Sequence, residues 1–119
     1  MIIRDIKKLA PFLSGDRVLL REILHGSKDN LQIGYSLAHA LVAPGKSSLP
    51  HRLKSSEVYY VISGKGRMRI GEEVREVGRG QTVAIPPGAV QSIENTGRSD
   101  LEFLCIVSPA WRPEDEEIL

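Results

Sequence analysis

Two β-strands and the turn between them can be read directly from residues 57–71, whose sequence is Glu-Val-Tyr-Tyr-Val-Ile-Ser-Gly-Lys-Gly-Arg-Met-Arg-Ile-Gly. The run before Gly64 is rich in β-branched and aromatic residues, and the shorter run after it ends at another glycine, as expected for a hairpin. Because side chains alternate between the faces of a strand, Glu57, Tyr59 and Val61 share one face. This stretch therefore predicts a β-hairpin with a carboxyl group on its inner face.

The same pattern extends through the rest of the chain. Short runs of Val, Ile, Leu and Tyr are separated by turn residues at intervals of about 7 to 12 residues, which is typical of β-sandwiches and β-barrels. The predicted strands are Arg17–Ile23, Tyr35–Ala43, Glu57–Ser63, Gly66–Ile70, Glu73–Val77, Thr82–Ile85, Gln91–Asn95 and Leu101–Val107. One helical turn is predicted at Asp5–Phe12, where Asp5 caps the first turn and Pro11 ends it. The sequence therefore predicts an all-β protein.

Length and composition predict one globular domain. The chain has 119 residues, of which 41% are hydrophobic and 26% charged. We expect a single domain over residues 1–119, with its core at about residues 17–108 and a solvated acidic tail at residues 113–119. The single cysteine, Cys105, excludes an internal disulfide and a multi-cysteine zinc site.

Charge and hydropathy exclude several classes of partner. The formal net charge is +1, which gives no basic surface for nucleic acid or anionic lipid. No apolar run approaches the roughly 20 residues that span a bilayer. The N-terminus lacks the apolar segment and cleavage site of a signal peptide. We therefore expect a cytoplasmic protein that binds neither nucleic acid nor membranes.

Alternation also assigns the faces of two later strands. Ser92 and Glu94 are polar and are expected to face water, and Glu102 marks the outer face of the last strand in the same way. The residues predicted to face inward are Gln91, Ile93, Asn95, Leu101, Phe103, Cys105 and Val107. Leu104 and Ile106 make the outer face of the last strand apolar as well, which indicates a second layer or a partner chain.

Ten residues with defined spacings form two motifs. They are Gly45-x5-His51-x-Leu53-x3-Glu57-x6-Gly64 and, 15 residues later, Gly80-x5-Pro86-x-Gly88-x2-Gln91-x3-Asn95. These motifs resemble the two signatures of the cupin superfamily, G-x5-H-x-H-x(3,4)-E-x6-G and G-x5-P-x-G-x2-H-x3-N, and match at eight of the ten positions. The resemblance implies a double-stranded β-helix, which is a jelly-roll barrel of two antiparallel sheets.

The two departures from these motifs concern metal ligands. In the cupin family, both histidines and the glutamate of the first motif bind one divalent metal together with the histidine of the second. Leu53 replaces one histidine here, and Gln91 replaces another. The resemblance therefore implies a metal site made of His51, Glu57 and, as a weaker oxygen donor, Gln91. The candidate ions are Fe, Mn, Zn, Cu and Ni.

A pocket without metal is the alternative. Leu53 would then extend the apolar lining, and Gln91 would hydrogen-bond to His51 or Glu57. An inward-facing Glu57 needs a raised pKa, a pairing with His51 or a metal ion, since an isolated buried carboxylate is costly. His39 supplies a second imidazole only if it faces the interior, and periodicity does not decide which face of its strand is inside.

Other candidate residues have two readings each. Tyr59 shares the face of Glu57 and can present its hydroxyl to a substrate, or it can be a core residue. Cys105 can lie beside the pocket or be a small core residue. His25 lies in a polar loop and is expected to face solvent. Trp111 can cover one end of the barrel or pack on a neighbouring chain.

Two classes of function follow from these observations. One is a metal-dependent enzyme that acts on a small organic molecule. The other is a metal-free pocket that binds or senses a small ligand, in which His51 beside Glu57 can act as a general base. The resemblance also implies a homodimer, with N-terminal strands exchanged or packed across its interface. The fold itself does not select between the two classes.

Overall fold

The chain folds into strands connected by short loops, as a computed structural model of all 119 residues shows. The strands are β1 (Phe12–Leu13), β2 (Leu19–His25), β3 (Ser36–Val42), β4 (His51–Leu53), β5 (Ser56–Ser63), β6 (Lys65–Ile70), β7 (Glu73–Gly78), β8 (Thr82–Ile85), β9 (Gln91–Asn95), β10 (Leu101–Ser108) and β11 (Glu116–Ile118). The two helices, η1 (Ile6–Lys8) and η2 (Pro113–Asp115), are single 3-10 turns. None of the helices is long and apolar enough to cross a membrane. The predicted all-β class is confirmed.

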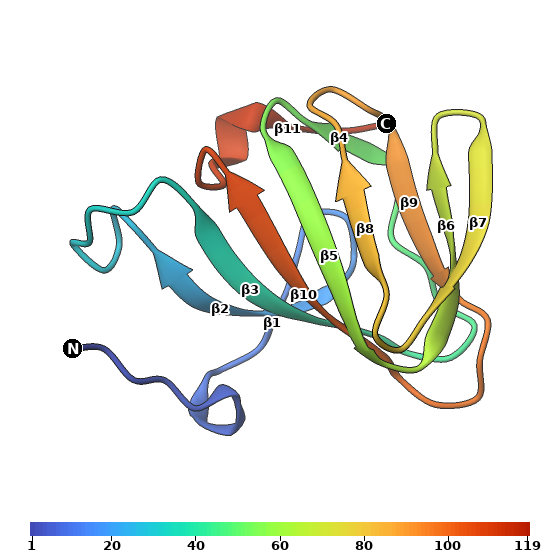
Figure 1. Cartoon of the computed structure of the whole chain (residues 1–119), viewed down its shortest axis with the longest axis horizontal. Helices are drawn as coiled ribbons and strands as arrows, with labels where there is room; N and C mark the ends of the chain where they lie inside the picture. Colours follow the sequence, from blue (N-terminus) through green and yellow to red (C-terminus); the bar gives the residue numbers. More distant parts are fainter.

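Two antiparallel sheets form the two layers of the molecule (Figure 1). One has six strands in the order β1-β2-β3-β10-β5-β8, and the other has five in the order β11-β4-β9-β6-β7. Strands that are adjacent in a sheet are mostly distant in sequence, as in a jelly roll. The predicted jelly roll of two antiparallel sheets is confirmed.

The turn at Gly64 is not a hairpin, contrary to the prediction. Strand β5 pairs with β10 and β8, whereas β6 pairs with β7 and β9, so the chain passes from one sheet to the other at this glycine. Gly64 has φ of 84°, and a Cβ atom there would lie 2.6 Å from the carbonyl oxygen of Asp100. Only glycine fits this crossing, because the backbone approaches closely in a left-handed conformation.

All eight predicted strands exist, with ends within two residues of the prediction, and three further strands were missed. Strand β2 starts at Leu19 and not at Arg17 because Arg17 has φ of 69°, which is incompatible with a strand. Strands β1, β4 and β11 contain only two or three residues each, too few for an alternating pattern. The predicted helical turn is also shorter, although Asp5 caps it by accepting a hydrogen bond of 2.9 Å from the Lys7 amide.

The acidic tail at residues 113–119, predicted as a solvated terminus, is mostly exposed and also forms a short strand. Strand β11 pairs with β4 at the edge of the five-stranded sheet, and Ile118 lies opposite His51. The Leu119 amide donates a hydrogen bond of 3.0 Å to the Pro50 carbonyl oxygen. An edge strand exposes unpaired backbone groups, and the tail satisfies those of β4.

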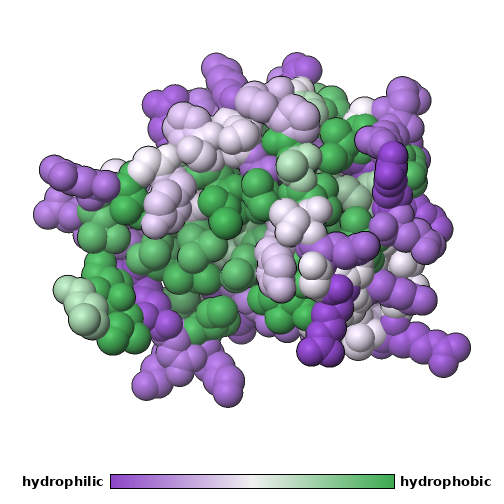
Figure 2. All heavy atoms as spheres, viewed as in Figure 1, coloured by the Kyte–Doolittle hydropathy of each residue, from purple (hydrophilic) through white to green (hydrophobic).

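The core lies between the two sheets, on the faces predicted by alternation. All seven residues predicted to face inward on β9 and β10 are buried. On β5, Glu57, Tyr59 and Val61 are buried as well, in line with the prediction. The predicted apolar outer face also exists: Ile106 is 39% exposed and Tyr60, on the neighbouring strand, is 45% exposed. Figure 2 shows a continuous hydrophobic area on this side of the molecule, over β3 and β10.

Candidate functional site

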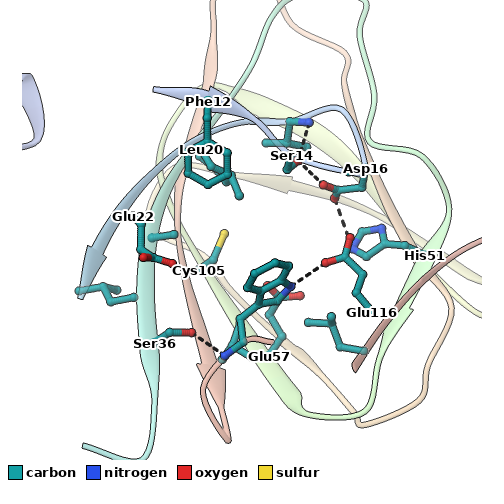
Figure 3. Close-up of a pocket in the computed structure, with 18 of the residues that line it drawn as sticks. Phe12, Ser14, Asp16, Leu20, Glu22, Ser36, His51, Glu57, Cys105 and Glu116 are labelled. Atoms are coloured by element: carbon teal, nitrogen blue, oxygen red, sulfur yellow. Dashed lines mark hydrogen bonds and ion pairs between the residues drawn. The ribbon is translucent and has the colours of Figure 1, made fainter. Parts of the chain in front are cut away.

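A cavity of about 230 Å³ opens between the sheets, and 13 of its 22 lining residues are hydrophobic. Strands β2, β3, β5 and β10 supply one wall, and β4, the segment before β2 and the C-terminal segment supply the rest (Figure 3). The polar side chains that line it are Ser14, Asp16, Glu22, Lys28, Ser36, His51, Glu57, Tyr59 and Glu116. A largely apolar cavity with a few convergent polar groups is the usual form of a small-molecule site.

Glu57 is the buried acid of this cavity. Its side chain points inward from β5, is only 7% exposed, and accepts one hydrogen bond of 3.0 Å from Gln91 Nε2 to Oε1. Burial raises its pKa to about 8, the Gln91 hydrogen bond opposes this rise, and the charges of Asp16 and Glu116 add to it. Glu57 is therefore mostly protonated at neutral pH, which is one of the three outcomes expected for an inward-facing carboxyl group.

Gln91 connects Glu57 to Tyr59. The Tyr59 hydroxyl donates to Gln91 Oε1 at 3.0 Å, so the amide oxygen faces Tyr59 and the amide nitrogen faces Glu57. Gln91 thus makes the hydrogen bond to Glu57 that was one of the predicted alternatives. Because Glu57 Oε1 accepts this bond, the carboxyl proton resides on Oε2, which has no hydrogen-bond partner within the chain.

His51 lies across the cavity, at the start of β4. Its side chain is buried, and Nδ1 lies 2.8 Å from the Leu49 carbonyl oxygen. A carbonyl oxygen only accepts, so Nδ1 donates this hydrogen bond, and Nε2 makes no hydrogen bond within the chain. Nε2 lies 3.4 Å from Asp16 Oδ2. The ionic neighbour of His51 is therefore Asp16, whereas the sequence had suggested Glu57.

Asp16 is a site residue that sequence reasoning missed. It lies in the loop between β1 and β2, accepts a hydrogen bond from Ser14, and holds the Leu49 amide with its own carbonyl oxygen at 2.8 Å. The second of these bonds fixes the segment that positions His51. Asp16 stands in no motif, and only its position in a Gly-containing turn distinguishes it in the sequence.

The C-terminal segment closes the cavity from the other side. Trp111 donates from its indole nitrogen to Glu116 at 2.7 Å and from its amide to Ser36 at 2.9 Å, so it covers one end of its own barrel. The Trp111 carbonyl oxygen lies 2.8 Å from His25 Nε2. His25 is only 7% exposed, which corrects the expectation that it faces solvent. It is buried because the segment at Trp111, for which covering one end of the barrel was one of two expectations, packs over it.

Tyr59 and Cys105 both line the cavity, as the sequence allowed, but with restricted chemistry. The Tyr59 hydroxyl is engaged by Gln91, and its ring packs against Phe103 with centroids 4.5 Å apart. Burial raises the pKa of the Cys105 thiol well above its usual value, and the charge of Glu57 adds to this effect. The thiol is therefore protonated and unreactive at neutral pH.

His39 does not reach the cavity. It projects from β3 to the outer side of the six-stranded sheet, opposite Ala38 and Ala40, and lies 2.7 Å from Glu102 Oε1 through Nε2. Its Nδ1 atom is buried without a partner, and Nε2 donates to the Glu102 carboxylate, which only accepts. The question that periodicity left open is thus decided: His39 adds no second imidazole to the site.

The donor set does not fit the metal that the cupin motifs imply. No group of three or more His, Cys, Asp or Glu side chains is placed to hold a metal ion. Leu53 presents an apolar side chain to the cavity, and the Gln91 oxygen already accepts from Tyr59. His51 and Glu57 do face the same cavity, but they are engaged with Leu49 and Gln91, respectively.

The fold and the site define an all-β protein of two antiparallel sheets that enclose a polar site at one end. Comparison with known families identifies the family to which the chain belongs. The chain belongs to the cupin family, since residues 38–107 match the model of the Cupin domain. An uncharacterized protein of Methanocaldococcus jannaschii is 38% identical over 97% of this chain and 92% of its own length.

Other relatives are longer proteins. The mannose-1-phosphate guanylyltransferase ManC of Salmonella typhimurium is 26% identical over 98% of this chain, which spans only 26% of that enzyme. Similar solved structures include a predicted oxalate decarboxylase of Thermotoga maritima, with a TM-score of 0.78, 24% identity, and 92% and 99% of the two chains covered. Oxalate decarboxylase of Bacillus subtilis has a TM-score of 0.82 and 21% identity, with 96% of this chain and 31% of that one covered. These structures share the fold.

Proposed function

We propose that this cupin binds a small organic molecule in the interior cavity without the aid of a metal ion, and that Glu57 is the group that recognises it. The observation that supports the proposal is a protonated carboxyl group whose Oε2 lacks any partner within the chain and which lines a cavity. An unpartnered Oε2 atom on the cavity wall is free to hydrogen-bond to an oxygen or nitrogen atom of a ligand.

The cavity volume sets the size of the ligand. An apolar cavity of about 150 Å³ holds a benzene molecule. The present cavity, of about 230 Å³, therefore suits a molecule of one substituted ring or a short branched chain. Glu57 supplies a proton donor and His51 Nε2 an acceptor, so the ligand carries polar groups as well as an apolar part.

The cavity does not suit the substrates that appear in the names of the relatives. Mannose 1-phosphate and oxalate are anions, and an anion needs a cationic partner when it leaves water. Lys28 is the only Lys or Arg side chain that lines the cavity, and it already pairs with Glu22 at 3.0 Å. The cavity is therefore suited to a ligand without negative charge.

Acid–base catalysis is a second candidate function. It is favoured by one observation, namely that Glu57 Oε2 and His51 Nε2 line the same cavity and neither makes a hydrogen bond within the chain. Glu57 would deliver a proton to one ligand atom while His51 Nε2 removes a proton from another, which is the chemistry of an isomerisation. This candidate requires a ligand and is tested after binding has been measured.

A fragment screen on chelator-treated protein tests the proposed function. We expect neutral or cationic single-ring fragments to perturb the NMR signals of cavity residues, with elemental analysis of the same sample showing no stoichiometric metal. Ala38→Leu fills the cavity and is expected to weaken these fragments by about tenfold or more. Ala84→Leu, on the exposed side of β8, is the matched control. Binding that disappears on chelation and returns with metal would contradict a metal-free site.

We also propose that the outer face of the six-stranded sheet associates with a second copy of this chain. Its apolar residues on β5 and β10 are Val58, Tyr60, Ile62, Leu104 and Ile106. None of these is charged, so a two-fold contact of the patch with itself brings no like charges together.

Ile106→Lys is expected to convert this dimer into a monomer, because it places an ammonium group in the centre of an apolar contact. Molar mass measured by light scattering during gel filtration reports the change. Val74→Lys introduces the same group at a residue on the other sheet with comparable exposure, 41% against 39%, and is expected to leave the mass unchanged. A monomeric parent protein would exclude the interface.

A further inference from the structure

The carboxyl groups of the cavity outnumber its cationic partners. Asp16, Glu22, Glu57 and Glu116 line it, against Lys28 and His51. Lys28 is paired with Glu22, and Glu57 is neutralised by its own proton. Glu116 accepts a hydrogen bond from the Trp111 indole and has no Lys or Arg partner, while the only potential cation beside Asp16 is His51. Two carboxylates therefore face the cavity without a permanent positive charge.

The negative charges of Asp16 and Glu116 act on the buried carboxyl group of Glu57. Both Asp16 and Glu116 raise the pKa of Glu57, although burial is the larger cause. The two carboxylates come from opposite ends of the chain, and the second of them is held in place by Trp111. Figure 3 shows Asp16, His51 and Glu116 gathered on one side of the cavity and Phe12 and Leu20 on the other.

Two polar atoms of residues that line this region have no hydrogen-bond partner within the chain. His51 is 3% exposed, and its Nε2 atom makes no hydrogen bond within the chain, only the 3.4 Å contact with Asp16. Glu57 is 7% exposed, and its Oε2 atom is unpartnered. The buried side-chain atom without a partner in this protein is His39 Nδ1, so these two atoms are instead accessible from the cavity and available to a ligand.

We propose that the ligand of this cavity carries a positively charged amino group on an apolar ring or chain, with Asp16 and Glu116 facing the ammonium group. This inference rests on the proposed function, that the cavity binds a small molecule. An ammonium group has three donors and no acceptor, and the oxygen atoms of the two carboxylates match these donors. The apolar part lies against Phe12 and Leu20.

A neutral hydroxyl group satisfies this site less well. It can hydrogen-bond to Asp16 or Glu116, but it leaves both negative charges uncompensated in a largely apolar cavity. A carboxylate in the same position adds a third negative charge. Charge-assisted hydrogen bonds are also about twice as strong as neutral ones. The expected order of affinity is therefore amine, then alcohol, then acid.

Three probes of nearly equal shape test this order. Benzylamine, benzyl alcohol and benzoate share one ring and differ in charge, and each is titrated into the full-length protein at pH 7 while calorimetry or NMR records binding. We expect benzylamine to bind at least about tenfold more tightly than benzyl alcohol, and benzoate to bind most weakly.

The double variant Asp16→Asn with Glu116→Gln removes the charges and keeps an acceptor for Ser14 and for the Trp111 indole. It is expected to lose about tenfold or more in affinity for benzylamine and clearly less in affinity for benzyl alcohol. Glu72→Gln removes one charge from an exposed turn and is expected to change neither affinity. A melting temperature close to that of the parent protein verifies that each variant is folded.

The outcomes separate the two proposals. If benzylamine and benzyl alcohol bind equally well, or if the double variant weakens both equally, the preference for an amine is wrong and the cavity still binds small molecules. If none of the three probes binds at millimolar concentration, the proposed function is contradicted together with the inference. Tight binding of benzoate alone would overturn the assignment of charge.

Discussion

Glu57→Gln is expected to remove most of the pH dependence of stability between about pH 4.5 and pH 8. The folded protein keeps the Glu57 proton up to a pKa of about 8, whereas the ordinary value of 4.5 applies to the unfolded chain. Between these values the folded state binds one more proton than the unfolded state. The free energy of unfolding therefore falls as the pH rises, by up to about 1.4 kcal/mol per pH unit. Below pH 4.5, both states are protonated and this contribution is constant.

Urea denaturation at pH 5 and pH 8, followed by the fluorescence of Trp111, measures this effect. We expect the parent protein to lose on the order of 3 kcal/mol between the two pH values, and Glu57→Gln to lose much less. Glutamine has nearly the same shape and can still accept the Gln91 hydrogen bond, so the comparison isolates the ionisation. Glu72→Gln, at an exposed turn, serves as the control. Equal slopes in all three proteins would show that Glu57 is ionised in the folded state.

Restoring two histidines is expected to create a metal site. Leu53 and Gln91 both face inward, and Gln91 lies opposite His51 in the register of β9 and β4. Leu53→His with Gln91→His therefore places three imidazoles beside Glu57, a donor set that suits zinc, nickel or manganese. We expect the double variant to retain about one ion per chain through desalting. An ion at 100 times its Kd adds about 2.7 kcal/mol to the free energy of unfolding.

Elemental analysis after desalting, together with melting curves with and without the ion, checks this prediction. A triple variant that adds His51→Ala keeps the two new histidines but removes the resident one, and it is expected to lose the metal. Retention of metal by the triple variant would place the ion elsewhere. Absence of metal in the double variant would mean that the inward faces of β4 and β9 do not converge as described.

Alternation predicted the strands that have one buried face. On β5, β9 and β10 the pleat and the burial pattern coincide, so sequence alone placed Glu57, Gln91 and Cys105 on the inner side. It failed for β1, β4 and β11, whose two or three residues contain no repeat. It also misread the turn at Gly64, because a glycine-bounded turn looks the same whether the strands pair or separate.

Of the residues that line the cavity, the two motifs predicted only those that stand at motif positions. Spacing brought His51 and Glu57 together, and the structure places both in one cavity. Asp16 and Glu116 come from segments outside both motifs, and packing across the sheets brings them there. The orientation of Gln91 also depends on a long-range contact, the hydrogen bond from Tyr59. Such contacts leave no periodic trace in a sequence, so the charge of the site was not foreseeable.

The position of β11 at the edge of the five-stranded sheet has a practical consequence for protein engineering. The residues that close the cavity, Trp111 and Glu116, lie in a stretch that contacts the sheets only through β4 and a few side chains. A library of variants at residues 111–118 can therefore change which ligands the cavity prefers while leaving the central strands unaltered. The part of the cavity lining that follows β10 is thus separate from the central strands, so selection can alter that part of the site while His51 and Glu57 stay in place.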